Sequence, residues 1–170
     1  LPVSLNQGQL LVEGAWNGSI EQGRVTGRLE SGPATVKGHA FDRLETSFDA
    51  ASTQFSLRDF RLHASGASLE GEGTIGLDAW RPVDSGRLSG VVRLKAPQLT
   101  PVLALAGYSS LPLSGAVNAT LHLEGAYGSP AASGTVEVSN LTAWGEKIQS
   151  LKAEFHATPA DFDIPVVTLA

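Results

Sequence analysis

The chain has 170 residues, of which 42% are hydrophobic and 17% charged, with a formal net charge of −5. Lys and Arg are scattered singly, so no basic stripe could follow a phosphate backbone, and nucleic acid is not an expected partner. Cysteine is absent, which excludes disulfides and thiolate metal sites and is compatible with the cytosol or the bacterial periplasm.

The first third of the chain contains short alternations of apolar and polar residues, which are typical of half-buried strands. They cover Val25–Leu29, Val36–Ala40 and Leu44–Ala50, and the middle alternation includes Gly38. Turn-forming pairs such as Asn17-Gly18 separate these runs. The pattern predicts strands from the beginning of the chain.

The rest of the chain alternates more strictly. The clearest runs are Leu69–Leu77, Leu88–Ala96, Leu113–Leu123, Gly134–Val138 and Leu151–Ala157. Short turns between runs favour antiparallel pairing of consecutive strands. We therefore expect an all-β fold of about a dozen antiparallel strands, forming one unit over residues 1–170.

One segment breaks the alternation. Thr100 is a candidate N-cap, and Pro101 suits the first helical position. Leu103, Leu105 and Ala106 could then share an apolar face. The sequence predicts one short helix near Pro101–Ala106.

An offset of 107 residues relates two parts of the chain, roughly 8–63 and 115–170, without a gap. The matched pairs include Gly27 with Gly134, Leu44 with Leu151, Phe48 with Phe155, and Leu62 with Leu169. Such a unit is longer than common solenoid repeats of about 20–50 residues, so it should contain several strands. We favour an extendable sheet over an old duplication inside one sandwich, because both chain ends lie within the alternating pattern. We also interpret the chain as a fragment of a larger protein.

Motifs that could support enzymatic chemistry have structural explanations. The Gly71–Gly76 segment has the G-x-G-x-x-G form, but it lies inside an alternating run and no helical pattern follows it. Glu70 and Glu72 share a strand face, where we expect them to pair with Arg87 and Arg93.

The remaining chemistry-bearing residues also form no recognisable site. The histidines are His39, His63, His122 and His156, and none has the local spacing of a metal pair. No serine lies in a nucleophile elbow. We expect no enzyme activity, no catalytic residue, no metal and no cofactor.

The one-sided apolar face is the remaining candidate site. A second sheet could cover it, as in a sandwich, or it could line a groove for a ligand. Small residues would leave room in such a groove: Gly71, Gly73, Gly90, Gly115, Ala119 and Ala153. The residues alone leave both possibilities open.

The order of elements from residue 66 onward resembles the bacterial TamB/AsmA-like family. The residues that carry the resemblance are Leu113-x-Gly115-x-Val117-x-Ala119-x-Leu121-x-Leu123-x-Gly125, Ser129-Pro130-x-x-Ser133-Gly134-x-Val136-x-Val138, and Ile148-x-x-Leu151-x-Ala153-x-Phe155. Gln98–Ala106 corresponds to the short leucine-rich helix that often precedes these strands in the family. The chain lacks the family's N-terminal anchor and the C-terminal end that engages a barrel, so only the conduit part is expected here.

The resemblance implies a periplasmic protein of a Gram-negative bacterium, anchored in the inner membrane. Its long antiparallel sheet would fold over into a β-taco with an apolar groove, and carry phospholipids between the two membranes. It also implies pairing with an outer-membrane barrel of the TamA type, linked to outer-membrane protein assembly. The competing hypotheses are a chaperone-like holder of unfolded β-strands and a structural sandwich spacer.

Under the lipid hypothesis, alternation assigns the lining of the groove. The predicted acyl-chain-binding residues are Leu69, Ile75, Leu77, Leu88, Val92, Leu94, Val117, Leu121, Leu123, Val136, Val138 and Phe155. Thr120, His122 and Arg93 are predicted to point away.

Overall fold

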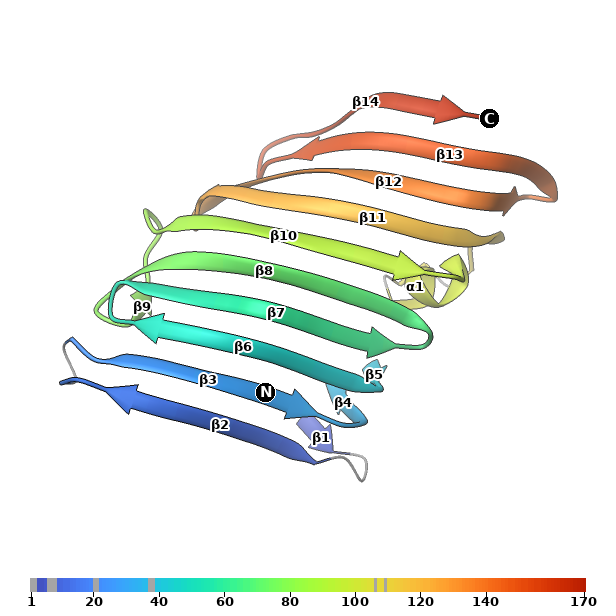
Figure 1. The fold of residues 1–170 in the computed structure, drawn as a ribbon. Helices are drawn as coiled ribbons and strands as arrows, with labels where there is room; N and C mark the ends of the chain where they lie inside the picture. The colour runs from blue at the N-terminus through green and yellow to red at the C-terminus, as the bar shows by residue number, and fades with distance from the viewer. Residues whose placement is uncertain (1–2, 6–8, 20–21, 37–38, 106, 109) are drawn as a thin grey trace.

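The structure is a computed structural model that describes residues 3–5, 9–19, 22–36, 39–105, 107–108 and 110–170 (Figure 1). Within these ranges the chain forms fourteen strands and one short helix. The predicted all-β fold with a single short helix is therefore confirmed.

A large antiparallel sheet contains eleven of the strands. They are β2 (Leu10–Asn17), β3 (Arg24–Ser31), β6 (Arg43–Ala51), β7 (Gln54–Ala64), β8 (Ala67–Asp78), β9 (Arg81–Pro82), β10 (Arg87–Ala96), β11 (Leu113–Ala126), β12 (Ser129–Ala143), β13 (Glu146–Ala157) and β14 (Phe162–Leu169). Their spatial order runs from β14 to β2 in reverse chain order, with β9 paired only to β8. Consecutive strands are neighbours because short turns bring each strand back beside the previous one.

Three short strands form a second sheet: β1 (Val3–Leu5), β4 (Ala34–Val36) and β5 (His39–Phe41). The prediction of one strand over Val36–Ala40 is wrong, because Val36 pairs with His39 across a hairpin. A period of two gives no information on where a chain reverses direction. Gly38 lies outside the described residues.

The helix α1 covers Leu99–Leu105, so it begins two residues before Pro101. The N-cap assignment of Thr100 is wrong, since Thr100 lies inside the first turn and its hydroxyl donates to the carbonyl of Leu113 at 3.4 Å. Pro101 is tolerated there because the first helical N–H groups have no intrahelical partner. Ala106 lies outside the described residues. No helix in the described part of the chain has the length and apolar character needed to cross a membrane.

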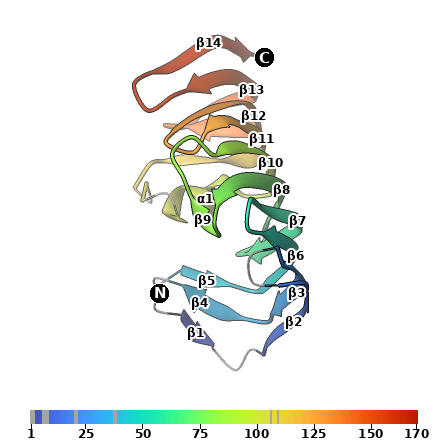
Figure 2. The same ribbon diagram turned by 90° about the vertical axis from the view of Figure 1, so that its left-hand side faces the viewer.

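α1 packs on one side of the large sheet and forms its core there. The buried cluster consists of Ala67, Ala96, Leu99, Val117, Val138 and Leu141. The small sheet and β9 project to the same side of the large sheet (Figure 2). These elements lie against parts of the apolar face, and neither α1 nor the small sheet extends over all of it (Figure 2).

The molecule exposes far more surface than a compact domain. Its accessible area is 10964 Å², whereas a compact protein of 17.7 kDa would expose roughly 7,900 Å². None of the large side chains in the described part of the chain is fully buried. The large sheet is therefore mostly a single layer, and the apolar face away from α1 stays partly exposed.

The offset of 107 residues also relates the pairing of the strands. Corresponding pairs are Leu10–Ser31 and Val117–Val138, Gly27–Phe48 and Gly134–Phe155, and Leu44–Leu62 and Leu151–Leu169. The four strands β2, β3, β6 and β7 are thus paired with one another in the same register as β11, β12, β13 and β14. The hairpin β4–β5 corresponds to the hairpin end of β12 and β13, since Ala34–Phe41 matches Leu141–Ile148.

Candidate functional site

Strand pairing places the twelve predicted groove residues on one face of the large sheet. Residues that pair directly across an antiparallel ladder have side chains on the same face. One continuous row is Phe60, Gly71, Val92, Leu121, Gly134 and Phe155. The next row is Leu62, Leu69, Leu94, Ala119, Val136 and Ala153. Ile75 pairs with Leu88, Gly90 with Leu123, and Leu77 follows Ile75 by two residues.

The inner face, as we name this side, is almost free of charge at the directly paired positions from β2 to β13. Glu146 is the charged exception among these described positions. It is the first residue of β13 and pairs with Ala143, at the end of the sheet where α1 packs. Ser31 and Thr46 are polar members of the face, and both are buried. The inner face therefore presents mainly apolar groups to its surroundings.

Neighbouring positions in each strand belong to the opposite face, which we call the polar face. Arg93 pairs with Thr120, and His122 pairs with Val91. All three residues that were predicted to point away from the groove therefore do so.

The inner face is not equally accessible along its width. Val117 and Val138 are only 4% and 7% exposed, because α1 packs over them. The other ten predicted residues are half-buried and keep part of their side chains open. Val117 and Val138 thus pack against the helix, and the open part of the inner face begins beside them.

A cavity of about 320 Å³ lies on the open part of the inner face, between β7 and β11. Its apolar walls include Phe55, Leu57, Phe60, Ile75, Leu88, Val92 and Leu123. Gly71, Gly73 and Gly90, which have no side chain, line it as well. They are three of the six small residues that were expected to leave room.

The wall on β7 was missed from the sequence, because a bulge interrupts the alternation there. The register with β8 shifts between Leu57 and Phe60, and Asp59 has a φ of 51°. Asp adopts this left-handed conformation more readily than most residues. The extra residue of the bulge keeps both Leu57 and Phe60 at the cavity. The Asp between these two apolar residues is the sequence signal that could have indicated the bulge.

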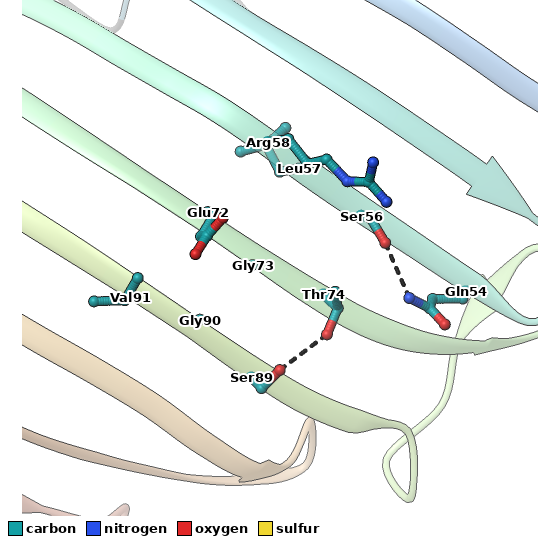
Figure 3. Close-up of a pocket in the computed structure, with 10 residues that line it drawn as sticks. All are labelled: Gln54, Ser56, Leu57, Arg58, Glu72, Gly73, Thr74, Ser89, Gly90 and Val91. Atoms are coloured by element: carbon teal, nitrogen blue, oxygen red, sulfur yellow. Dashed lines mark hydrogen bonds between the residues drawn. The ribbon is translucent and has the colours of Figure 1, made fainter.

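A second depression, of about 380 Å³, lies on the polar side of the same strands (Figure 3). Gln54 donates from Nε2 to the hydroxyl of Ser56 at 3.0 Å, and the hydroxyls of Thr74 and Ser89 are 3.0 Å apart. Gly73 lines both depressions, so the sheet is thin at this point. These four side chains therefore bond in pairs, Gln54 with Ser56 along one strand and Thr74 with Ser89 across two strands.

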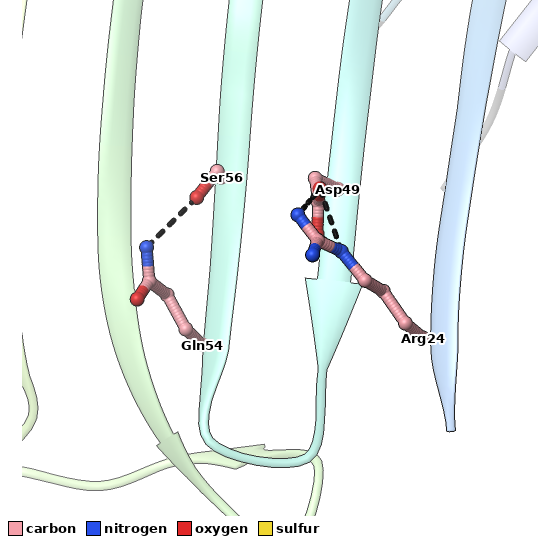
Figure 4. Close-up of polar contacts among 4 residues, drawn as sticks. All are labelled: Arg24, Asp49, Gln54 and Ser56. Atoms are coloured by element: carbon pink, nitrogen blue, oxygen red, sulfur yellow. Dashed lines mark hydrogen bonds and ion pairs between the residues drawn. The ribbon is translucent and has the colours of Figure 1, made fainter. Parts of the chain in front are cut away.

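An ion pair between Arg24 and Asp49 connects neighbouring strands on the polar face, as Figure 4 shows. The Nε of Arg24 donates to both carboxylate oxygens of Asp49, at 2.8 and 2.9 Å. This hydrogen bonding lowers the pKa of Asp49 and raises the pKa of Arg24. Strand pairing puts Glu70 directly opposite Arg93, as expected for cross-strand charges. The expected pairing of Glu72 and Arg87 is wrong, because Glu72 lies opposite Val91 and Arg87 lies opposite Ala126.

Other candidate motifs do not form sites. The Gly71–Gly76 segment lies within β8, and the chain continues through a turn into β9. No group of three potential metal ligands occurs among the described residues.

Comparison with known proteins gives no relative from which a function could be transferred. No protein-family model, no curated protein and no solved structure matches the chain. The resemblance to the TamB/AsmA-like family therefore stays a prediction, and the function has to be argued from the geometry of the inner face.

Proposed function

We propose that this chain is a conduit segment that binds the acyl chains of phospholipids on the inner face of its large sheet. The observation that carries the proposal is an apolar face that continues across the sheet and stays partly exposed to solvent. An open apolar face of this size is typical of a surface that meets an apolar ligand.

The dimensions of the inner face suit a path for lipid. Ten strands lie side by side from β2 to β14, and a spacing of about 4.8 Å gives a path of roughly 43 Å. Because each row of paired residues runs across the strands, apolar side chains continue along this direction.

The physical advantage of such a path is a lower barrier for transfer. Exposing an acyl chain to water costs about 0.8 kcal/mol per methylene, or on the order of 13 kcal/mol for a sixteen-carbon chain. Contact with the inner face removes much of this cost without any chemical step. The charged residues of the polar face would remain in water.

The resemblance extends this proposal to the parent protein. In that setting the segment would lie in the periplasm, within a protein anchored in the inner membrane and paired with an outer-membrane barrel of the TamA type. Lipid would then move between the inner and outer membranes.

A second candidate function is the holding of unfolded β-strands. It is favoured by the two edge strands, β2 and β14, in which every residue is exposed. An unpaired edge can accept an extended peptide by strand addition. Such binding would use the backbone of the edge, whereas lipid would use the inner face.

Photo-crosslinking from two neighbouring residues tests the proposal. Leu121 and Thr120 are adjacent in β11 and both half-exposed, but they lie on opposite faces. A photo-reactive residue at Leu121 should capture phospholipid in cells, and the same residue at Thr120 should not. Equal lipid capture from both positions, or capture of polypeptide alone at Leu121, would contradict the proposal.

A further inference from the structure

Trp and Tyr lie only near the ends of strands or in connections, whereas Phe also occurs in strand interiors. The Trp and Tyr residues are Trp16, Trp80, Tyr108, Tyr127 and Trp144. Phe48, Phe60 and Phe155 lie in strand interiors, and Phe41, Phe55 and Phe162 lie at or next to a strand end. These two sets contain all the aromatic residues of the chain.

This division has a general physical meaning. Trp and Tyr favour boundaries where one part of the ring contacts apolar groups and the other contacts water, whereas Phe favours the apolar side. The ends of the strands therefore have the composition of a boundary between hydrocarbon and water, with the inner face between them.

The two ends of the strands differ in access. At one end, α1 packs over Ala96 and Val117 and seals the face. At the other end, Trp16, Trp80 and Tyr127 form what we call the aromatic rim. Trp16 and Tyr127 are 51% and 47% exposed, so this rim remains in contact with water.

The aromatic rim is held in place by contacts between distant segments. The rings of Trp16 and Trp80 stack with centroids 5.6 Å apart and planes 24° apart. The backbone N–H of Trp80 donates to the carbonyl of Ser52 at 3.0 Å, and that of Tyr127 donates to the carbonyl of Gly86 at 2.8 Å. The turn after β8 is thereby fixed beside the edge of the inner face.

The strip from the aromatic rim to the sealed end is longer than a single acyl chain, so a chain that starts at the rim can lie along it in full. On β10, the inner-face residues run from Leu88 near the rim to Ala96 beneath α1, which is about 26 Å at a rise of about 3.3 Å per residue. A single acyl chain spans half of a bilayer's hydrocarbon core, or roughly 15 Å. The cavity of about 320 Å³, which includes Leu88 and Ile75, lies within this strip.

We infer that the aromatic rim binds the glycerol-ester region of a phospholipid whose acyl chain lies along the strands and points toward α1. This inference rests on the proposed lipid-conduit function. It adds an orientation: ester groups at Trp16, Trp80 and Tyr127, and chain ends deeper on the inner face.

Tryptophan fluorescence can measure this orientation in the whole chain. Three reporters all keep the rim residues Trp16 and Trp80. The rim reporter is Trp144→Phe. The face reporter is Trp144→Phe with Leu121→Trp, and its signal is the difference from Trp144→Phe alone. The outer control is Trp144 itself, whose signal is the difference between the native chain and Trp144→Phe. Each variant is loaded with phosphatidylcholine that carries a nitroxide on the head group, on the fifth chain carbon or on the sixteenth, and is then separated from vesicles by gel filtration.

The expected pattern is opposite for the rim and face reporters. Fluorescence of the rim reporter should be quenched at least twice as strongly by the head-group or fifth-carbon label as by the sixteenth-carbon label, and the face reporter should show the reverse order. The outer control, whose Trp144 lies in the turn between β12 and β13, should be little affected. Circular dichroism confirms folding, and Phe155→Trp, in the same row as Leu121, replaces the face reporter if the Leu121→Trp variant does not fold.

The outcomes separate this inference from the function on which it rests. No quenching of any reporter would remove lipid binding altogether. Quenching of the rim reporter mainly by the sixteenth-carbon label, or equally by all labels, would overturn the orientation while leaving lipid binding intact. Protein that elutes only with vesicles would indicate a membrane-surface contact and would also overturn the inference.

Discussion

Two neighbouring valines provide a sharp test of the inner face. Val91 and Val92 are consecutive in β10 and both half-buried, but Val92 pairs with Leu121 and Gly71 on the inner face. Val91 pairs with His122 and Glu72 on the polar face. Val92→Arg therefore introduces a charge into the lipid path, and Val91→Arg introduces the same charge outside it.

The structure suggests how large the effects should be. Burying a Val side chain fully contributes roughly 1.5–3 kcal/mol, so losing the half-buried Val92 should cost about 1 kcal/mol of folding free energy. A bound acyl chain would have to desolvate the guanidinium or withdraw from it. Withdrawal of three methylenes would cost about 2.4 kcal/mol, which corresponds to roughly 50-fold weaker binding. Val91→Arg lies opposite Glu72 and should change folding by less than about 1 kcal/mol.

Lipid extraction and mass spectrometry of the purified variants measure the result. We expect Val92→Arg to lose most of its bound phospholipid, and Val91→Arg to retain the wild-type amount. Urea denaturation of both variants shows whether they remain folded. Wild-type lipid content in a folded Val92→Arg variant would refute the reasoning, as would an equal loss of lipid from both variants.

Three further predictions follow from the repeat, the cavity and the polar face. Phe48 and Phe155 each cover the glycine paired with them. Phe48→Ala and Phe155→Ala should therefore each lower the free energy of unfolding, measured by urea denaturation, by about 1–3 kcal/mol. If the two losses differ by more than about 2 kcal/mol, the two residues do not have equivalent roles. Gly73→Val should reduce bound lipid several-fold by filling the cavity. Its Cβ would lie 3.2 Å from the backbone oxygen of Ser89, a tight contact that requires a small shift of β10, so circular dichroism checks that the variant is folded. Undiminished lipid in the folded variant would show that this cavity is not used. Arg24 lowers the pKa of Asp49 in the folded state. The pair therefore stabilises the fold at pH values above the ordinary Asp pKa of about 3.9, and this stabilisation is lost as the pH falls through the lowered pKa. The Tm of Asp49→Asn should decrease less on acidification than that of the native chain, and an identical pH profile of Tm would contradict this.

The sequence alone was sufficient for the character of the sheet. Alternation at a period of two depends only on the geometry of a strand, so it assigned Leu121 and Val92 to one face and Thr120 to the other. Short turns between the runs made sequential antiparallel pairing the simplest topology. The offset of 107 residues was also visible in the sequence, since identical residues such as Phe48 and Phe155 occupy matching positions.

Features that break the period required the tertiary structure. A bulge at Asp59 places Leu57 and Phe60 at the same cavity, although strict alternation would put residues three apart on opposite faces. Likewise, the short run from Val36 to Ala40 is a hairpin, because alternation does not record the direction of the chain.

Tertiary structure also decided which part of the apolar face is covered. Val117 and Leu121 are equivalent by alternation, yet α1 buries the first and leaves the second half-exposed. Trp16 and Trp80 are separated by 64 positions in the sequence, but their rings stack at the edge of the inner face. Local pattern determines the side of the sheet on which a residue lies, because that follows from the backbone of its own strand. Whether the residue is covered depends on segments distant in the sequence, and only their packing in three dimensions determines that.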